Sequence, residues 1–321
     1  MLNKKFETVS RYKCKASIML EGLPGKGKSG LALLLGTALA DYEPEYVSAI
    51  DTENESLSLF KGLPASSGEP FDKFKKVNLT PEDGYSPSNY LELRAAAVKD
   101  GAKVVISDSI THAWQYEGGI LSMVSNYVAT HSNPKDKYAP WNDAAISKEK
   151  NLLLDLIRSR DCHVITTVRV KEKFAPETQA DGKTKIKSLG EQQIMQDDLK
   201  YEPDLVLHAI QAGCGQEGRI VHPKVTVVKS RYPMFAEGET YEMTPDLIES
   251  MRVWLAEGAD PTELLEKQRQ DYITGITEYL NANPTKETFW QILKSQEGCE
   301  KTKLTELPLV TIKKLLNKLT L

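Results

Sequence analysis

A glycine-rich octapeptide near the amino terminus has the residue types and spacing that bind the phosphates of a nucleotide. It reads GLPGKGKS and satisfies the pattern G-x-x-x-x-G-K-[S/T]. Its glycines let the backbone curl so that successive N–H groups point at phosphate oxygens, and a following helix would add its positive end. Lys28 would reach the β- and γ-phosphates, and the Ser29 hydroxyl would bind Mg²⁺. The segment therefore predicts a site for ATP and Mg²⁺, formed by Gly22, Pro24, Gly25, Lys26, Gly27, Lys28, Ser29 and Gly30.

Acidic residues at the ends of two apolar runs could complete this chemistry. Asp108 closes the run VVISD and is predicted to bind Mg²⁺ together with Ser29. A cap on the next helix is the alternative for Asp108. Another apolar run ends in Asp51-Thr-Glu53, where Glu53 is predicted to orient or deprotonate the attacking water. Asp51 is the second choice for this role and is expected to lie against the nucleotide. The alternative for Asp51 and Glu53 is a solvated acidic turn.

Strand-length apolar runs alternate with helical patterns over most of the chain, and this alternation would place the carboxylates beside the glycine-rich segment. Strands are expected at 16–20, 46–50, 104–107, 164–168, 205–210 and 225–228. Helices are expected at 30–40, 56–60, 90–99, 112–130 and 144–159. Such alternation is typical of an α/β fold with a mainly parallel sheet flanked by helices. Ligands bind at the carboxyl edge of the strands in such sheets, which is where these residues would lie.

The character of the chain changes near residue 245. Residues 1–245 are predicted to form an ATPase core, whereas residues 246–321 contain only helical patterns and are predicted to form a small α-helical region. The composition, with 40% hydrophobic and 27% charged residues, excludes a disordered, collagen-like or disulfide-scaffold protein. The four cysteines form no CxxC pair, and no apolar run approaches the roughly 18 to 20 residues of a membrane span. A cytoplasmic protein without a membrane partner is therefore expected.

Taken together, these motifs resemble the RecA-like P-loop ATPase core. The segment VVISDSITHAW is similar in particular to the phage ATPases grouped with the Sak-type single-strand-annealing recombinases, and the resemblance covers roughly residues 12–240. In this family the catalytic glutamate follows the strand after the phosphate loop, which is the position of Glu53. The resemblance implies a RecA-like P-loop NTPase fold and a magnesium-dependent ATP hydrolase. It also implies a homo-oligomeric ring or filament that binds single-stranded DNA in recombination, repair or replication. The protein would then be encoded by a phage and act in the host cytoplasm.

The resemblance assigns roles to residues in two later strands. Thr167 or Arg169 would contact the γ-phosphate, although the glutamine typical of the family is absent there. Lys229 and Arg231 alternate on a strand, so they would share a face and, as in the family, reach the ATP of a neighbouring subunit. A cation at that place stabilises charge on the transferred phosphoryl group. Polar or basic strand ends in solvent are the alternative for both strands.

Two basic segments are predicted to bind DNA. Residues 169–187 hold six Lys or Arg against three Asp or Glu, a net charge of +3, and residues 133–141 combine lysines with aromatic side chains. Lysines would neutralise phosphates, and aromatic rings would stack on bases. A solvated mobile loop is the alternative for the first segment. The predicted contacts are Lys171, Lys173, Phe174, Lys183, Lys185, Lys187, Lys135, Lys137 and Tyr138.

The net charge of the chain, −4, does not exclude a DNA partner because the segments expected to face DNA are basic. A hexameric helicase or helicase loader remains an alternative function. A DNA-annealing scaffold that ATP assembles, with negligible hydrolysis, is another. The helical region at 246–321 could bind a single-strand-binding or replication protein.

Overall fold

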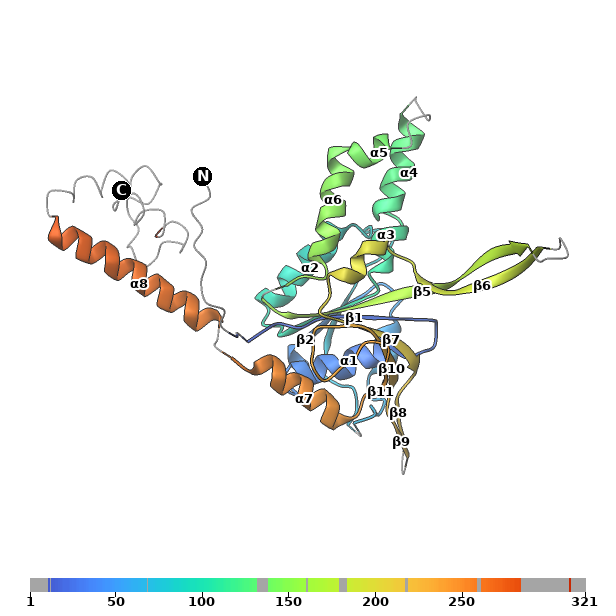
Figure 1. Cartoon of the computed structure of the whole chain (residues 1–321), viewed down its shortest axis with the longest axis horizontal. Helices are drawn as coiled ribbons and strands as arrows, with labels where there is room; N and C mark the ends of the chain where they lie inside the picture. Colours follow the sequence, from blue (N-terminus) through green and yellow to red (C-terminus); the bar gives the residue numbers. More distant parts are fainter. Residues whose placement is uncertain are drawn as a thin grey trace. The chain divides into compact units, whose positions relative to one another are not determined.

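The core of the molecule is a nine-stranded, mainly parallel sheet with β1 near its middle (Figure 1). The strand order is β11-β10-β7-β1-β5-β4-β2-β3, and β6 pairs with the outer part of β5. The five pairings from β7 to β3 are all parallel, whereas β6, β10 and β11 are antiparallel to their neighbours. The strands are β1 (Ser17–Gly22), β2 (Val47–Asp51), β3 (Lys75–Asn78), β4 (Val104–Asp108), β5 (His163–Thr178), β6 (Thr184–Gln193), β7 (Leu205–Gln211), β10 (Lys224–Ser230) and β11 (Thr240–Glu242). A separate two-stranded sheet joins β8 (Cys214–Gln216) and β9 (Arg219–Val221).

This computed structural model describes residues 11, 13–67, 69–131, 138–159, 161–178, 184–216, 219–258, 261–283 and 312. The chain divides into two compact units, Cys14–Leu255 and a second unit made of Met1–Lys13 with Ala256–Leu321. The helices of the first unit are α1 (Lys28–Leu39), α2 (Pro87–Lys99), α3 (Thr111–Gln115), α4 (Ile120–Thr130), α5 (Ala139–Asn142), α6 (Ala144–Asp155) and α7 (Pro245–Ala256), whose last residue begins the second unit. The second unit contains α8 (Pro261–Ala282).

Helices pack on both faces of the sheet because the central strands are apolar on both sides. In β1, Ile18 and Leu20 face one core cluster and Met19 faces the other, as alternation along a strand requires. Buried residues of α1 and α7 complete the first cluster. Buried residues of α2, α3 and α6 complete the second, for example Tyr90 and Leu153. The predicted α/β fold with a mainly parallel sheet flanked by helices is confirmed.

Each predicted strand overlaps an observed one, within one residue at its start, but the segment at 169–187 is not the loop that the sequence suggested. Instead, β5 continues to Thr178 and β6 returns from Thr184, and the two strands extend beyond the sheet as a long hairpin (Figure 1). Strand β3 was also missed. The helical prediction after residue 245 agrees with α7 and α8, and its part at 284–311 and 313–321 lies outside the described residues. The buried Ile248, Met251 and Leu255 of α7 belong to the same core cluster as α1.

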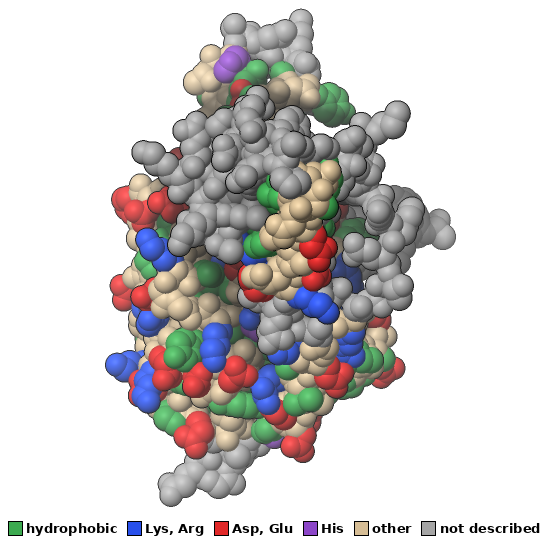
Figure 2. Space-filling model, turned by 90° about the vertical axis from the view of Figure 1, so that its left-hand side faces the viewer, with side chains coloured by type: hydrophobic (Ala, Val, Ile, Leu, Met, Phe, Trp, Pro, Cys, Tyr) green, Lys and Arg blue, Asp and Glu red, His purple; other side chains and the backbone are tan. Residues whose placement is uncertain are grey.

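A helical projection forms the other extension of the first unit. Helices α4 and α6 lie side by side and lead away from the sheet, with α5 between them (Figure 1). Among the described side chains on the face seen in Figure 2, those of Lys and Arg are intermingled with those of Asp and Glu. None of the helices among the described residues is both long and apolar enough to cross a membrane.

Candidate nucleotide-binding and catalytic site

The predicted phosphate-binding segment connects the carboxyl end of β1 to the first turn of α1. Gly25 and Gly27 have φ values of +76° and +84°, a region that favours glycine. A Cβ on Gly27 would lie 2.7 Å from the Cα atom of Ala212, so this turn also requires the absence of a side chain. Gly27 is the N-cap of α1 and provides no side-chain hydrogen bond to the helix. The first-turn N–H groups of α1 therefore remain available to an anion.

The Lys28 ammonium is folded back onto the loop from which it projects. Its Nζ donates to the carbonyl oxygens of Gly22 and Leu23, at 2.9 and 3.1 Å. Burial lowers the pKa of Lys28, and the nearby Glu53 and Asp108 carboxylates act in the opposite direction. The predicted lysine and the two predicted carboxylates are thus close enough to influence one another.

Strand register brings the carboxylates to this edge. In β2 and β4, Asp51 is opposite Asp108, and Gly22 of β1 is opposite Arg169 of β5. Because parallel strands end at a common edge, residues from four distant parts of the sequence meet here. The predicted grouping of the phosphate loop with Asp51, Glu53 and Asp108 agrees with this geometry.

Asp108 is buried and incompletely bonded. Its Oδ1 accepts a hydrogen bond from the Thr167 hydroxyl, whereas its Oδ2 is buried without a hydrogen-bond partner. Burial raises the pKa of Asp108 to about 6; the Glu53 charge adds to the shift, and the hydroxyls of Ser29 and Thr167 oppose it. A free carboxylate oxygen beside a hydroxyl is the hard oxygen set that Mg²⁺ prefers, so the residues present fit this ion. Thr167, predicted to contact the nucleotide, is seen to contact Asp108.

Both carboxylate oxygens of Asp51 are engaged by the backbone, so this side chain has a structural role. Its Oδ1 accepts a hydrogen bond from the Glu53 N–H at 2.8 Å, and its Oδ2 accepts one from the Leu57 N–H at 3.0 Å. The side chain is almost fully buried. Asp51 therefore holds the turn after β2 and leaves Glu53 as the carboxylate that can act on water.

Glu53 forms an ion pair with Arg169 at the same edge. Arg169 Nε donates to Glu53 Oε1 at 2.9 Å, and Arg169 Nη1 donates to the Tyr116 hydroxyl at 3.0 Å. About a quarter of the Glu53 side chain and a third of the Arg169 side chain are exposed. The pair spans 116 positions in the sequence, so no local pattern predicted it.

Three further polar side chains at this edge, those of Thr52, Tyr90 and His112, were not predicted from the sequence. The Thr52 hydroxyl accepts a hydrogen bond from the Ser109 N–H at 2.8 Å and lies 2.9 Å from His112 Nδ1. Tyr90 is fully buried and donates to the Ser109 carbonyl at 2.9 Å. Burial lowers the pKa of His112, with the Arg169 charge as the second cause. The Thr52 contacts attach the end of β2 to the end of β4, and Tyr90 attaches α2 to the same point.

A second cluster surrounds Glu21, the residue that precedes the phosphate loop. Glu21 accepts a hydrogen bond from Gln193 and lies 3.2 Å from His208 Nδ1. His208 Nε2 in turn lies 3.4 Å from Glu191 of β6. The hydrogen bond to Glu21 raises the pKa of His208. The returning strand of the β5–β6 hairpin is therefore attached to the residue that leads into the phosphate loop.

Lys229 and Arg231 lie at the opposite edge of the sheet from the phosphate loop. Strand β10 is antiparallel to β7, and Ser230 is opposite Leu205, the first residue of β7. Lys229 Nζ donates to the Pro203 carbonyl at 2.6 Å, and burial lowers the pKa of Lys229. The two residues therefore take no part in the site of their own chain, and their action on the ATP of a neighbouring subunit stays a prediction.

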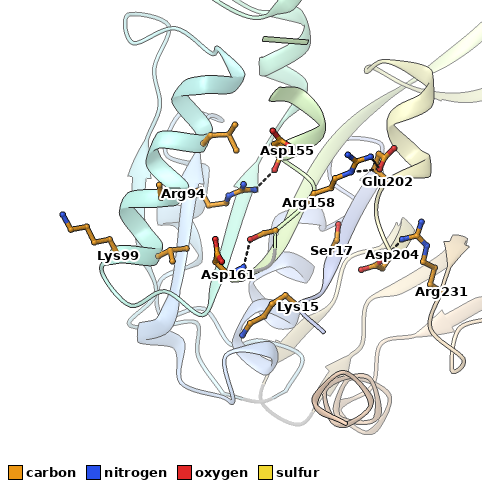
Figure 3. Close-up of a pocket in the computed structure, with 14 residues that line it drawn as sticks. Lys15, Ser17, Arg94, Lys99, Asp155, Arg158, Asp161, Glu202, Asp204 and Arg231 are labelled. Carbon is orange, nitrogen blue, oxygen red and sulfur yellow. Dashed lines mark hydrogen bonds and ion pairs between the residues drawn. The ribbon is translucent and has the colours of Figure 1, made fainter. Parts of the chain in front are cut away.

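Arg231 borders a cleft at that opposite edge. Figure 3 shows Arg231 facing Asp204, with which it forms an ion pair of 2.8 Å. Arg158 and Glu202 are paired beside it, and the cleft has a volume of about 1010 Å³. These four charged side chains at the cleft therefore form two ion pairs.

The predicted DNA contacts are described only in part. Lys171 is exposed on β5, and Tyr138 is 77% exposed before α5. Lys173, Phe174, Lys185 and Lys187 lie within the backbone of the hairpin, but their side chains are outside the description. The residues wholly outside the described ranges are Lys135, Lys137 and Lys183. Trp141, which follows Tyr138, stacks on Trp114 at 6.3 Å between ring centroids.

Within the described ranges, no three His, Cys, Asp or Glu side chains are grouped as a metal site made of protein alone would require. A Mg²⁺ ion held by Ser29 and Asp108 would instead share its shell with phosphate oxygens and water. No protein-family model matches the chain, and no curated protein is similar to it in sequence.

Proposed function

We propose that the chain is an ATPase with a RecA-like P-loop core that acts on single-stranded DNA in recombination, repair or annealing. The observation that carries the proposal is the meeting of the phosphate loop, the half-bonded Asp108 and Glu53 at one edge of a parallel sheet. A nucleoside triphosphate with its Mg²⁺ ion is the ligand that would engage all three groups. The proposed active form is a homo-oligomer in which Lys229 and Arg231 act on the ATP of a neighbouring chain.

Each group at this edge has its own role in the proposed hydrolysis. The N–H groups of the loop and Lys28 hold the β- and γ-phosphates, and Ser29 and Asp108 hold Mg²⁺. When bound, Mg²⁺ supplies positive charge against the phosphate oxygens. Glu53 orients a water molecule and accepts its proton as the water oxygen bonds to the γ-phosphorus. The bond between that phosphorus and the β–γ bridging oxygen breaks, and ADP leaves with the electron pair.

The DNA part of the proposal is supported by the hairpin that continues from the site. Strand β5 leaves the sheet directly after Arg169, and the segment 169–187 has a net charge of +3. A projecting basic strand pair can follow a nucleic-acid backbone, and its attraction falls with salt. The RecA-like assignment and the phage origin rest on the resemblance of the motifs alone.

Steady-state hydrolysis of ATP with and without an oligo-dT strand tests this function. We expect magnesium-dependent turnover that increases with DNA, and loss of turnover by more than about a hundredfold in Glu53→Gln. The variant Glu55→Gln changes an exposed carboxylate of the same turn and should retain turnover, because the Glu55 side chain accepts its one described hydrogen bond from the Asn78 amide. Absence of both hydrolysis and DNA binding at low salt in the unaltered chain would refute the proposal.

A further inference from the structure

Arg169 connects the carboxylate of Glu53 to the base of the β5–β6 hairpin. Its Nε donates to Glu53 Oε1 at 2.9 Å. Its Nη1 donates to the Tyr116 hydroxyl at 3.0 Å, and its guanidinium lies 5.7 Å from the centre of the Tyr116 ring. These contacts fix the direction of the guanidinium. As a result, one of the two Glu53 oxygens is engaged by a cation and is not free to accept a proton from water.

The backbone of Arg169 is part of the hairpin base. Its N–H donates to the buried Thr111 hydroxyl at 2.9 Å, and its carbonyl accepts from the Ile194 N–H at 2.8 Å. The next residue, Val170, pairs with Gln193 as the first rung of the hairpin. Because the hydrogen bond to Ile194 and the rungs that follow connect Arg169 to both strands, a change in the direction of the hairpin would move this residue and its side chain.

The returning strand of the hairpin provides a second, independent connection to the site. Gln193 donates a hydrogen bond to Glu21, and His208 lies between Glu21 and Glu191. Glu21 immediately precedes Gly22, the first residue of the phosphate loop. Both strands of the hairpin are thus attached to groups that border the nucleotide site, one at the carboxylate and one at the loop.

We propose that Arg169 is a positioning residue that restrains Glu53 while the hairpin is free. Single-stranded DNA bound along the hairpin draws Arg169 away, and both oxygens of the carboxylate then become available to water. The inference rests on the proposed ATPase function and adds to it the residue through which DNA controls hydrolysis. It differs from a role of Arg169 on the γ-phosphate, because the arginine here slows the reaction instead of assisting it.

The test compares steady-state ATP hydrolysis by the unaltered chain and by Arg169→Ala, each with and without oligo-dT. We expect the rate without DNA to rise about fivefold in Arg169→Ala, which corresponds to about 1 kcal/mol, with little change in KM. The ratio of the DNA-stimulated rate to the basal rate should fall towards one. Arg169→Lys, which keeps a cation near Glu53, should restore most of that ratio. DNA binding, followed by fluorescence anisotropy, should persist in both variants.

A matched control removes another arginine of the same unit. Arg252 of α7 pairs with Glu249 and Asp41, away from the site, and Arg252→Ala should leave the ratio unchanged. If Arg169→Ala does not fold, Tyr116→Phe carries the test, because it removes one hydrogen bond of the guanidinium and keeps the ring. It should raise the basal rate by a smaller factor.

The results separate this inference from the function on which it rests. A lower basal rate in Arg169→Ala, or an unchanged stimulation ratio in a variant that still hydrolyses ATP, would overturn the restraint alone. Absence of hydrolysis in the unaltered chain would overturn the proposed function and the restraint with it.

Discussion

The turn that carries Glu53 should depend on Asp51, and the cost of disturbing it can be worked from the structure. Asp51 is 1% exposed, and its two oxygens accept the N–H groups of Glu53 and Leu57 at 2.8 and 3.0 Å. In Asp51→Asn one oxygen still accepts, but the amide NH₂ meets a backbone N–H, donor against donor. A hydrogen bond to a charged group contributes about 1.5 to 3 kcal/mol, and the buried donor is left unpaired. We therefore expect the free energy of unfolding to fall by about 2 to 3 kcal/mol.

Urea unfolding followed by circular dichroism measures this loss. For an m-value of about 2.5 kcal/mol/M, the midpoint of Asp51→Asn should lie about 1 M below that of the unaltered chain. Glu55→Gln is the matched control, because Glu55 is an exposed carboxylate in the same turn. Its midpoint should agree with the unaltered chain within about 0.2 M. Coincident midpoints for the two variants would refute the structural role assigned to Asp51.

Two further predictions concern the phosphate loop and its neighbour. Gly25→Ala and Gly27→Ala both place a side chain at positive φ, but only the Cβ at Gly27 would collide with Ala212, whereas nothing lies within 4 Å at Gly25. We expect Gly25→Ala to lower the free energy of unfolding by about 1 kcal/mol, and Gly27→Ala to lower it by at least about 2 kcal/mol more, as measured by thermal unfolding. Equal losses in the two variants would contradict the packing of this loop. The hydrogen bond to Glu21 raises the pKa of His208, so the stabilisation from its protonated form is complete below about pH 6.5 and is lost as pH rises through the raised value. His208→Gln should therefore lose more stability at pH 6 than at pH 9, and a deficit independent of pH would show that its protonation does not stabilise the fold.

The central strands could be predicted from the sequence because each is apolar on both faces. β1, β4 and β7 appear as short apolar runs, which is typical of strands buried in a parallel sheet. β3 was not predicted because its four residues, KKVN, lie at the sheet edge and are half exposed. The hairpin was missed for a similar reason: β6 reads TKIKSLGEQQ and contains no apolar run, and among the described strands its partner is β5.

The members of the site were predictable where a local pattern marks them, whereas the contacts between their side chains were not. The spacing of Gly22, Gly27 and Lys28 is local, and a loop of this kind needs it to curl around phosphates. The contacts of Glu53 with Arg169 and of Glu21 with His208 join residues 116 and 187 positions apart. The first contact arises because β4 pairs with both β2 and β5, and the second because Glu21 of β1 is opposite His208 of β7. No single stretch of sequence contains this register.

The bonding state of each polar group separates the scaffold of the site from the groups that could act. Buried polar atoms of a folded chain are normally paired. Asp51 and Thr52 follow this rule, with backbone partners on each side of the turn. Asp108 is an exception, because its Oδ2 atom is buried without a hydrogen-bond partner. Lys28 donates hydrogen bonds to carbonyl oxygens of its own loop, and phosphate oxygens could replace these acceptors. Asp51 and Glu53 are two residues apart and equivalent as a sequence pattern, yet only Glu53 keeps a carboxylate whose partner is a partly exposed side chain that can move.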